Sequence, residues 1–202
     1  MRTSSSSRLD ESQRRYREIL EAAAKLIFRR GYEATSMQEI SAEAGLTKAG
    51  LYHYVATKEA LLLDIMHYGM DLFEEQVLTP AQLVEDPVER IRVVMARNLA
   101  LITHGAAKEV TIILHEHQTL TGEAQAQINA RKKKYVRFLE TAVREATAVG
   151  KVRPIDPTLA AFGLLGMVLW TYKWFQPGGA LSPEQLSEGM LELFFQGLLV
   201  RP

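Results

Sequence analysis

One short segment of the chain carries side chains suited to reading the edges of DNA bases. Lys48, Tyr52 and His53 fall on one side of a predicted helix, where they would be exposed. Ala49 and Gly50 are small, so this helix can approach base edges closely. A short helix with this decoration fits the major groove of DNA.

Three further polar residues stand where neighbouring predicted helices begin. Thr35, Ser36 and Lys58 combine hydroxyls, free backbone N–H groups and positive charge, which suit phosphate. The pattern alone leaves open a plain helical hairpin whose polar residues are only solvated.

The elements that position these side chains follow from local signals. Ser36 and Glu39 form a capping box that opens a short helix through Glu43, and Gly45 ends this helix and opens the turn. Thr47 caps a second short helix that covers residues 48 to about 54. Together they predict a helix-turn-helix unit. Apolar residues available to fix the angle between the two helices are Ile40, Ala44, Leu46 and Leu51.

Helical spacing dominates the whole chain, and no alternating pattern indicates a sheet. We therefore expect an all-α fold, with a disordered Ser-rich tail over residues 1–10. A helix-turn-helix domain would cover residues 11–57, and a helical bundle would cover residues 58–202. Outside the hairpin, helices are predicted over about 11–30, 58–77, 87–103, 108–120, 123–149, 157–175 and 183–199.

Composition excludes several classes of site. The 202 residues include no cysteine, so disulfides, thiolate metal sites and a cysteine nucleophile are ruled out. The five histidines lack the spacing of a metal site, and no catalytic motif is present, so we expect neither a metal nor an enzyme. No apolar run is long enough to cross a bilayer, which predicts a cytoplasmic protein with no membrane partner.

The bundle carries large apolar residues that could line a ligand cavity. The alternative for each of them is a place in the core. Methionine suits an adaptable apolar site. The candidate residues are Met66, Met70, Phe73, Met95, Leu99 and Ile113.

A second candidate set lies near the end of a predicted apolar helix. Trp170, Lys173 and Trp174 precede a Pro-Gly-Gly turn, and the basic run at residues 131–134 with Arg137 could add charge for phosphates. The alternatives are a dimer interface for the tryptophans and a solvated helix face for the basic run.

The first third of the chain resembles the N-terminal signature of TetR-family repressors, in register over nearly all of residues 12–63. Val55 stands where the family more often has phenylalanine, a conservative core change. The matching runs are Ile19-Leu20-Glu21-Ala22-Ala23, Phe28-Arg29-Arg30-Gly31-Tyr32-Glu33-Ala34-Thr35-Ser36, Ile40-Ser41-Ala42-Glu43-Ala44-Gly45, Gly50-Leu51-Tyr52-His53-Tyr54-Val55 and Lys58-Glu59-Ala60-Leu61-Leu62.

The resemblance implies a homodimeric repressor on palindromic double-stranded DNA, released by a small ligand. It implies base contacts from Lys48, Ala49, Gly50, Tyr52 and His53, with Met37 nearby. It implies phosphate contacts from Thr35, Ser36, Tyr52, Tyr54 and Lys58. It also implies dimerisation through the last two helices, for which our candidate seam is Leu164, Leu165, Val168, Leu191, Phe194 and Phe195.

Residues 165–179, with the following Leu181-Ser182-Pro183-Glu184, resemble the tail of a TetR subgroup that responds to acyl-CoA thioesters. This implies an acyl-CoA of fatty-acid, steroid or aromatic-acid breakdown as effector, and no resident cofactor. Two alternatives stay open: a repressor released by a free hydrophobic drug, and a DNA-binding dimer without any ligand.

Overall fold

The computed structural model describes residues 3–116 and 118–198, and within these ranges no β-strand is present. The expected all-α fold is confirmed. Its elements are α1 (Thr3–Arg30), α2 (Met37–Glu43), α3 (Lys48–Tyr54), α4 (Lys58–Phe73), the π-turn η1 (Glu74–Leu78), α5 (Thr79–Gln82), α6 (Pro87–Leu101), the π-turn η2 (Ile102–Ala106), α7 (Ala107–His115), α8 (Gly122–Ala148), α9 (Pro157–Leu169), the 3-10 turn η3 (Trp170–Lys173) and α10 (Pro183–Leu198).

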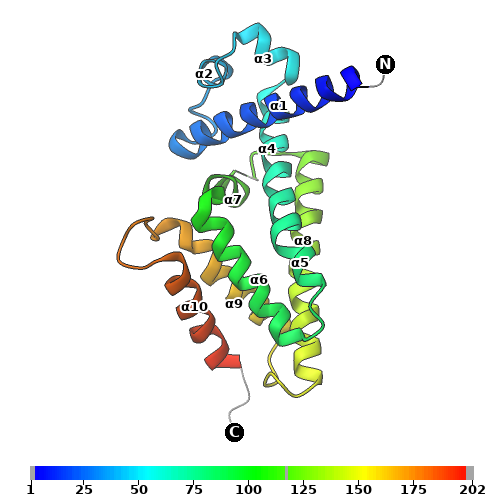
Figure 1. The fold of residues 1–202 in the computed structure, drawn as a ribbon, viewed down its shortest axis with the longest axis vertical. Coiled ribbons are helices and arrows are strands. Elements are labelled where there is room, and N and C mark those ends of the chain that lie inside the picture. The colour runs from blue at the N-terminus through cyan, green and yellow to red at the C-terminus, as the bar shows by residue number, and fades with distance from the viewer. Residues whose placement is uncertain (1–2, 117, 199–202) are drawn as a thin grey trace.

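Helices α1, α2 and α3 form a small head that sits across one end of the molecule (Figure 1). Apolar residues of α1, among them Ile19 and Ile27, are fully or nearly fully buried. They share this core with Ile40 of α2, Leu51 of α3 and Leu61 of α4, each with no exposed surface. A common core of this kind fixes the two short helices against α1.

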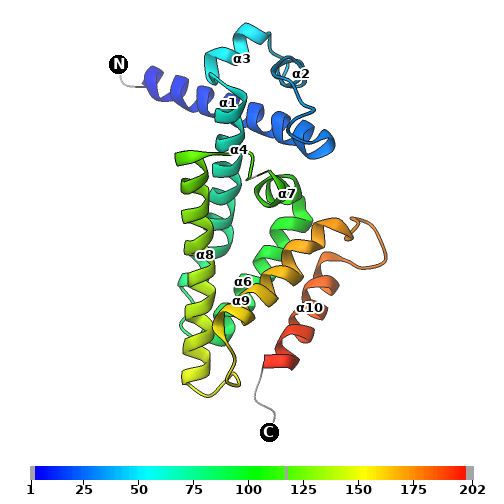
Figure 2. The same cartoon turned by 180° about the vertical axis from the view of Figure 1, so that it is seen from behind.

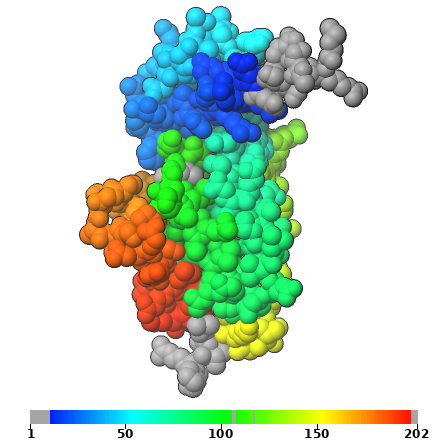
Figure 3. Space-filling model, in the orientation of Figure 1, coloured from blue at the N-terminus to red at the C-terminus, as the bar shows by residue number. Residues whose placement is uncertain are grey.

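Helices α4 to α10 form an elongated body beneath the head, and α4 begins in the head and continues into the body (Figures 1 and 2). Helix α8 runs beside α4 and packs against both α6 and α9. Helix α10 packs on α6. In the space-filling view the head lies on the body as a separate lobe (Figure 3). The body's core comes from apolar faces of all its long helices, including Met66, Met95, Leu139, Leu164 and Phe195.

Two body helices begin at the same Asp-Pro signal. Asp86 accepts hydrogen bonds from the backbone of Val88 and Glu89, and Asp156 accepts one from Leu159. The proline that follows each aspartate occupies the first helical position, where a missing N–H costs nothing. These signals explain why the starts of α6 and α9 were predicted correctly.

The N-terminal boundary was predicted wrongly. Helix α1 begins at Thr3 rather than near Glu11, so the segment expected to be a disordered tail is helical from Thr3 onward. No glycine or proline occurs between Thr3 and Arg30, so no residue interrupts the backbone hydrogen bonds of this helix.

Three C-terminal boundaries also differ from the prediction. Helix α4 continues past Val77 through η1 into α5, because a π-turn keeps the backbone bonded ahead of Pro80. Helix α7 ends at His115 rather than near Leu120, where a turn from Thr119 N to Glu116 O replaces it. Helix α9 ends at Leu169 and tightens into η3.

Candidate functional site

The two short helices of the head are held in place by their caps. The Ser36 hydroxyl accepts from Glu39 N at 3.2 Å, and the Glu39 carboxylate accepts from Ser36 N at 2.9 Å. The Thr47 hydroxyl accepts from Gly50 N at 3.0 Å. A Cβ on residue 50 would lie 3.3 Å from the Thr47 hydroxyl, so glycine leaves room for this cap.

Helix α3 turns one side inward and the other to solvent. Leu51 is fully buried, whereas Lys48, Ala49, Tyr52 and His53 are exposed, as the sequence predicted for a base-reading surface. Together they form one continuous edge of the head that mixes positive charge, an imidazole and a phenol. We call these four residues the α3 edge.

Contacts with α1 and α4 set the direction of α3. Tyr54 stacks on Tyr16 with ring centroids 6.2 Å apart, and the Tyr16 hydroxyl donates to the carboxylate of Asp64. Burial and the Asp64 carboxylate raise the pKa of Tyr16, so this hydroxyl remains a donor. Arg15 donates to the carbonyl of Ala44 at 2.8 Å and holds the end of α2.

The residues expected to contact phosphate are placed differently from one another. Ser36 is exposed, and Lys58 lies with its Nζ 4.0 Å from the centre of the Tyr32 ring. Thr35 and Met37 do not fit the expectation. Thr35 is 2% exposed and its hydroxyl donates to Gly31 O, while the Met37 side chain packs into the core of the head. The structure does not support a DNA contact by either side chain.

The body contains a cavity of about 880 Å³ between α4, α7, α8 and α9. Its walls are mostly apolar, with basic side chains along α8. The lining residues are Met70, Phe73, Val110, Ile113, Leu114, His115, Asn129, Lys132, Lys133, Tyr135, Val136, Arg137, Glu140, Phe162, Leu165, Gly166, Leu169, Trp170 and Tyr172.

Four of the nine predicted ligand residues line this cavity, namely Met70, Phe73, Ile113 and Trp170. The other five do not line it, for two reasons. Met66, Met95 and Leu99 have no exposed surface and belong to the core. Lys173 and Trp174 are exposed and lie outside the cavity, because the 3-10 turn after Leu169 rotates them away from the direction an α-helix would give.

The basic run of α8 divides between two faces of the helix. Arg131 pairs with Asp71 at 2.6 Å, and Lys134 pairs with Glu74 at 2.6 Å, so these two tie α8 to α4 and η1. Lys132, Lys133 and Arg137 instead line the cavity. Sequence reasoning could not separate these roles, because the sequence does not show which side of α8 faces α4.

Three polar features line the cavity. Half-buried Lys132 donates to the carbonyl of Ile113 at 3.3 Å, and burial lowers the pKa of its ammonium. His115 and the Tyr172 hydroxyl form a hydrogen bond across the cavity rim. Glu140, the one carboxylate in the lining, accepts from Thr158 at 2.8 Å. The basic residues therefore dominate the charge of the cavity.

Most residues of the expected dimer seam do not face outward from the protomer. Leu164, Leu165, Val168, Phe194 and Phe195 are buried within the protomer, and Leu191 is half-buried. The exposed large apolar residues of this region include Leu159, Phe162 and Trp170 after Pro157, and Leu193 on α10. Helix α9 is apolar on every side, so its sequence could not show which side faces the core.

Across residues 3–116 and 118–198, no three histidine or acidic side chains lie close enough to share a metal ion. No helix in the same ranges is long and apolar enough to span a bilayer.

Two family models match the chain. Residues 19–65 match the model described as bacterial regulatory proteins of the tetR family, and residues 84–198 match the model of the tetracyclin repressor-like C-terminal domain. The second match alone covers more than half of the chain. Members of this family are DNA-binding regulators rather than enzymes, as the sequence predicted.

Individual relatives agree over most of their length. AibR, solved in complex with isovaleryl coenzyme A and operator DNA, is 61% identical with a TM-score of 0.84, over 89% of this chain and 97% of that one. PfmR from Thermus thermophilus is 30% identical with a TM-score of 0.81, over 91% of this chain and 99% of that one. The repressor KstR2 of Mycobacterium tuberculosis is 25% identical over 90% of this chain and 91% of its own. The chain therefore belongs to the TetR family of bacterial transcriptional regulators.

Proposed function

We propose that this protein is a repressor that binds a palindromic operator as a homodimer and is released by an acyl-CoA thioester. The main observation in support of this effector is the cavity of about 880 Å³ in the body, which we call the effector cavity. Its apolar walls suit an acyl chain, and Lys132, Lys133 and Arg137 offer positive charge to the phosphates of coenzyme A.

The chain length of the effector follows from similarity. AibR is 61% identical and its structure contains isovaleryl coenzyme A, a thioester with a short branched acyl group. We therefore take isovaleryl-CoA as the first compound to test among the acyl-CoA thioesters that the resemblance implies.

DNA binding is assigned to the head. The α3 edge would enter the major groove, where Lys48, Tyr52 and His53 can reach base edges and Ala49 allows close approach. Gly50, half-buried beneath the Thr47 cap, would serve the same close approach. Phosphate contacts position the helix without specifying sequence, and they would come from Ser36, Tyr54 and Lys58 on either side of it.

The dimer is assigned to the exposed apolar face of the body. Leu159, Phe162 and Trp170 with Leu193 of α10 are exposed apolar side chains that a second copy of the chain would cover. Phe162 and Trp170 also line the cavity. The same two side chains would therefore serve both the dimer interface and the effector.

Two helices connect the cavity to the head. Helix α4 carries Met70 and Phe73 at the cavity and begins in the head at Lys58. Helix α7 carries Ile113 at the cavity, and the Glu116 carboxylate just beyond it accepts from Tyr32 N of the head at 3.2 Å. An occupant that displaces either helix would change the angle of the head.

The geometry of the operator makes this displacement effective. Two half-sites lie one helical turn, roughly 34 Å, apart, so a small rotation of each head misaligns both reading helices. Release also requires that the thioester bind the DNA-free arrangement more tightly, since equal affinity for both arrangements would shift nothing.

The test is an anisotropy titration of the protein on an operator selected by the protein from random duplexes. Isovaleryl-CoA, octanoyl-CoA, free coenzyme A and free isovalerate are added separately. We expect release by isovaleryl-CoA at concentrations at least about tenfold below those of coenzyme A or isovalerate. Release by free hydrophobic drugs with no response to any thioester would replace the acyl-CoA assignment with a drug-type effector.

A pair of lysine variants tests whether the thioester binds in the cavity or at the segment that follows α9. Lys133→Ala removes a basic residue of the cavity, and Lys173→Ala removes one that is also exposed but lies outside it. The first should weaken isovaleryl-CoA binding at least about fivefold, as expected for a lost charge-assisted contact, and the second should leave it unchanged. Equal effects of the two variants would contradict the cavity as the thioester site.

A further inference from the structure

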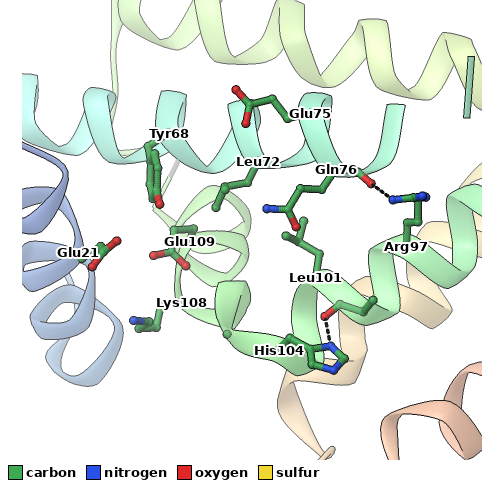
Figure 4. A pocket seen from close by; sticks show the side chains of 12 residues that line it. Glu21, Tyr68, Leu72, Glu75, Gln76, Arg97, Leu101, His104, Lys108 and Glu109 are labelled. Carbon is green, nitrogen blue, oxygen red and sulfur yellow. Dashed lines mark hydrogen bonds between the residues drawn. The ribbon is translucent and has the colours of Figure 1, made fainter. Parts of the chain in front are cut away.

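A second cavity, of about 680 Å³, lies at the junction of head and body (Figure 4). It shares no lining residue with the effector cavity. Helix α1 contributes Glu21, α4 contributes Tyr68 and Leu72, and the remaining walls come from η1, α6, η2 and α7. We call it the junction pocket. Neither the acyl-CoA proposal nor the DNA-binding proposal uses it.

The side chain of Glu109 is the unusual member of the junction pocket. It is 4% exposed, and its Oε2 atom has no hydrogen-bond partner among the residues that the structure describes. In Figure 4 its carboxyl group points into the space between Glu21 and Tyr68. A buried carboxylate oxygen without a partner is costly unless a donor or a cation reaches it.

The charges around Glu109 make this end of the pocket acidic. Glu21 lies across the pocket on α1, and Glu75 lies above it on η1 (Figure 4). Burial raises the pKa of the Tyr68 hydroxyl, and Glu21, Glu109 and Glu75 raise it further, whereas Arg17 lowers it. Lys108 also lies at this end and partly offsets the three carboxylates.

The other end of the junction pocket differs in character. Arg97 donates to the backbone carbonyl of Gln76 at 3.2 Å, and His104 bonds to the carbonyl of Ala100 at 2.8 Å, so both are held by the pocket wall. Leu72 and Leu101 form an apolar surface between the two ends (Figure 4). A ligand would meet carboxylates at one end and a short aliphatic surface beside them.

From this arrangement we infer that the junction pocket binds a small organic cation, with its ammonium or guanidinium group between Glu109, Glu21 and the Tyr68 hydroxyl. A short alkyl chain on the cation would lie along Leu72 and Leu101. The cation would supply the donor that Glu109 Oε2 lacks and would offset the repulsion between Glu109 and Glu21.

Binding at this place has a consequence for the head. Glu21 belongs to the head and Glu109 to the body, and α1 packs directly on α7. A cation bridging the two carboxylates would strengthen one arrangement of head on body. Operator affinity would then respond to the cation as well as to the acyl-CoA, through separate sites.

The direct test is isothermal titration calorimetry of the full-length protein with n-butylammonium, putrescine and agmatine. Neutral n-butanol and anionic butyrate serve as probes of the same chain length. We expect the three cations to bind at least about tenfold more tightly than n-butanol, and butyrate not to bind. Binding of n-butylammonium should tighten as the pH rises, because only an ionised carboxylate pairs with it.

Matched variants locate the cation. Glu109→Gln should weaken putrescine binding at least about tenfold, and Glu21→Gln, at an exposed position that tolerates substitution, at least about threefold. Glu85→Gln removes an exposed carboxylate outside both cavities and should change nothing.

Three results would overturn the inference: no binding of any cation, equal binding of n-butanol and n-butylammonium, or wild-type binding by both pocket variants. Isovaleryl-CoA titrations on the same proteins keep the two proposals apart. Glu109→Gln and Glu21→Gln should bind the thioester as the wild type does, and Lys133→Ala should bind putrescine as the wild type does.

Discussion

The head and the body hold their helices by different means. Helices α2 and α3 have seven residues each, too few to be stable alone, and they depend on caps and on ion pairs such as Lys25 with Glu43 at 2.6 Å. The body is built from helices of up to 27 residues that bury continuous apolar faces. Packing contributes most of its stability, alongside caps such as Asp86 and ion pairs such as Arg131 with Asp71.

This difference explains where a cavity can exist. The core of the head is small and all its helices share it, so we expect the head to move as one unit. The body keeps a complete core around Met66, Met95 and Leu99 and still leaves an open cavity of about 880 Å³ beside it. We therefore expect the acyl-CoA to act on the body, while the head contacts DNA.

The largest expected effect is on stability, and it should distinguish core residues of the body from residues that line the cavity. Met95→Ala removes a fully buried side chain and should lower the free energy of unfolding by about 2–5 kcal/mol. Met70→Ala, at the cavity wall, should cost less, because space already exists beside it, and should weaken acyl-CoA binding more. Urea denaturation and thioester titration of both variants measure this. Equal losses of stability would show that Met70 is core as well.

A charge on the exposed apolar face should break the dimer. Leu193→Asp places a carboxylate at a position that is 70% exposed in the protomer, so the protomer should fold while dimer affinity falls at least about a hundredfold, or ~2.7 kcal/mol. Phe195→Asp, at a buried position of the same helix, should instead unfold or precipitate the chain. Light scattering and circular dichroism distinguish the two. A Leu193→Asp protein that remains fully dimeric at micromolar concentration would move the interface elsewhere.

The α3 edge should govern operator affinity without affecting stability. Lys48→Ala and Tyr52→Ala should each weaken operator binding at least about tenfold, ~1.4 kcal/mol, because both side chains are exposed and would reach bases. Lys58→Ala should weaken all DNA alike and flatten the salt dependence, as the loss of a phosphate contact does. Anisotropy at several salt concentrations tests all three. Wild-type affinity in both α3 variants would mean that another helix reads the operator.

The smallest effect concerns the junction between the two regions. Burial raises the pKa of Glu109 above its ordinary value, so in the window above that ordinary value the folded state binds more protons than the unfolded state. Stability should therefore fall as the pH rises through the raised pKa. Glu109→Gln should remove this fall, so the variant should gain stability relative to the wild type as the pH rises above the ordinary glutamate pKa. Urea midpoints that shift in parallel for both proteins would contradict this.

The head could be predicted closely because its signals are local. Ser36, Glu39, Thr47 and the apolar spacing around them lie within twenty residues and determine their own helices. The exceptions are Thr35 and Met37. The Thr35 hydroxyl donates to Gly31 O and the Met37 side chain packs into the core, and neither contact can be recognised in the sequence.

The body could be predicted only as a set of helices. Which methionine faces a cavity depends on the rotation of each helix against its neighbours, so Met70 and Met95 were indistinguishable in sequence. The same holds for α9, where the apolar residues surround the helix and the prediction chose Val168 instead of Phe162 for the interface. No local pattern in the sequence predicts that Glu109 is buried, because its neighbours Glu21 and Tyr68 come from α1 and α4.

The chain contains two tryptophans, and only Trp170 lines the effector cavity. This residue is 58% exposed in the isolated protomer and lies on the face that a second copy would cover. The protein therefore carries its own optical reporter, since indole emission shifts to the blue when water leaves the ring. With Trp174 replaced by phenylalanine, a single fluorophore would record subunit association and then effector entry as two successive spectral changes, with no label attached.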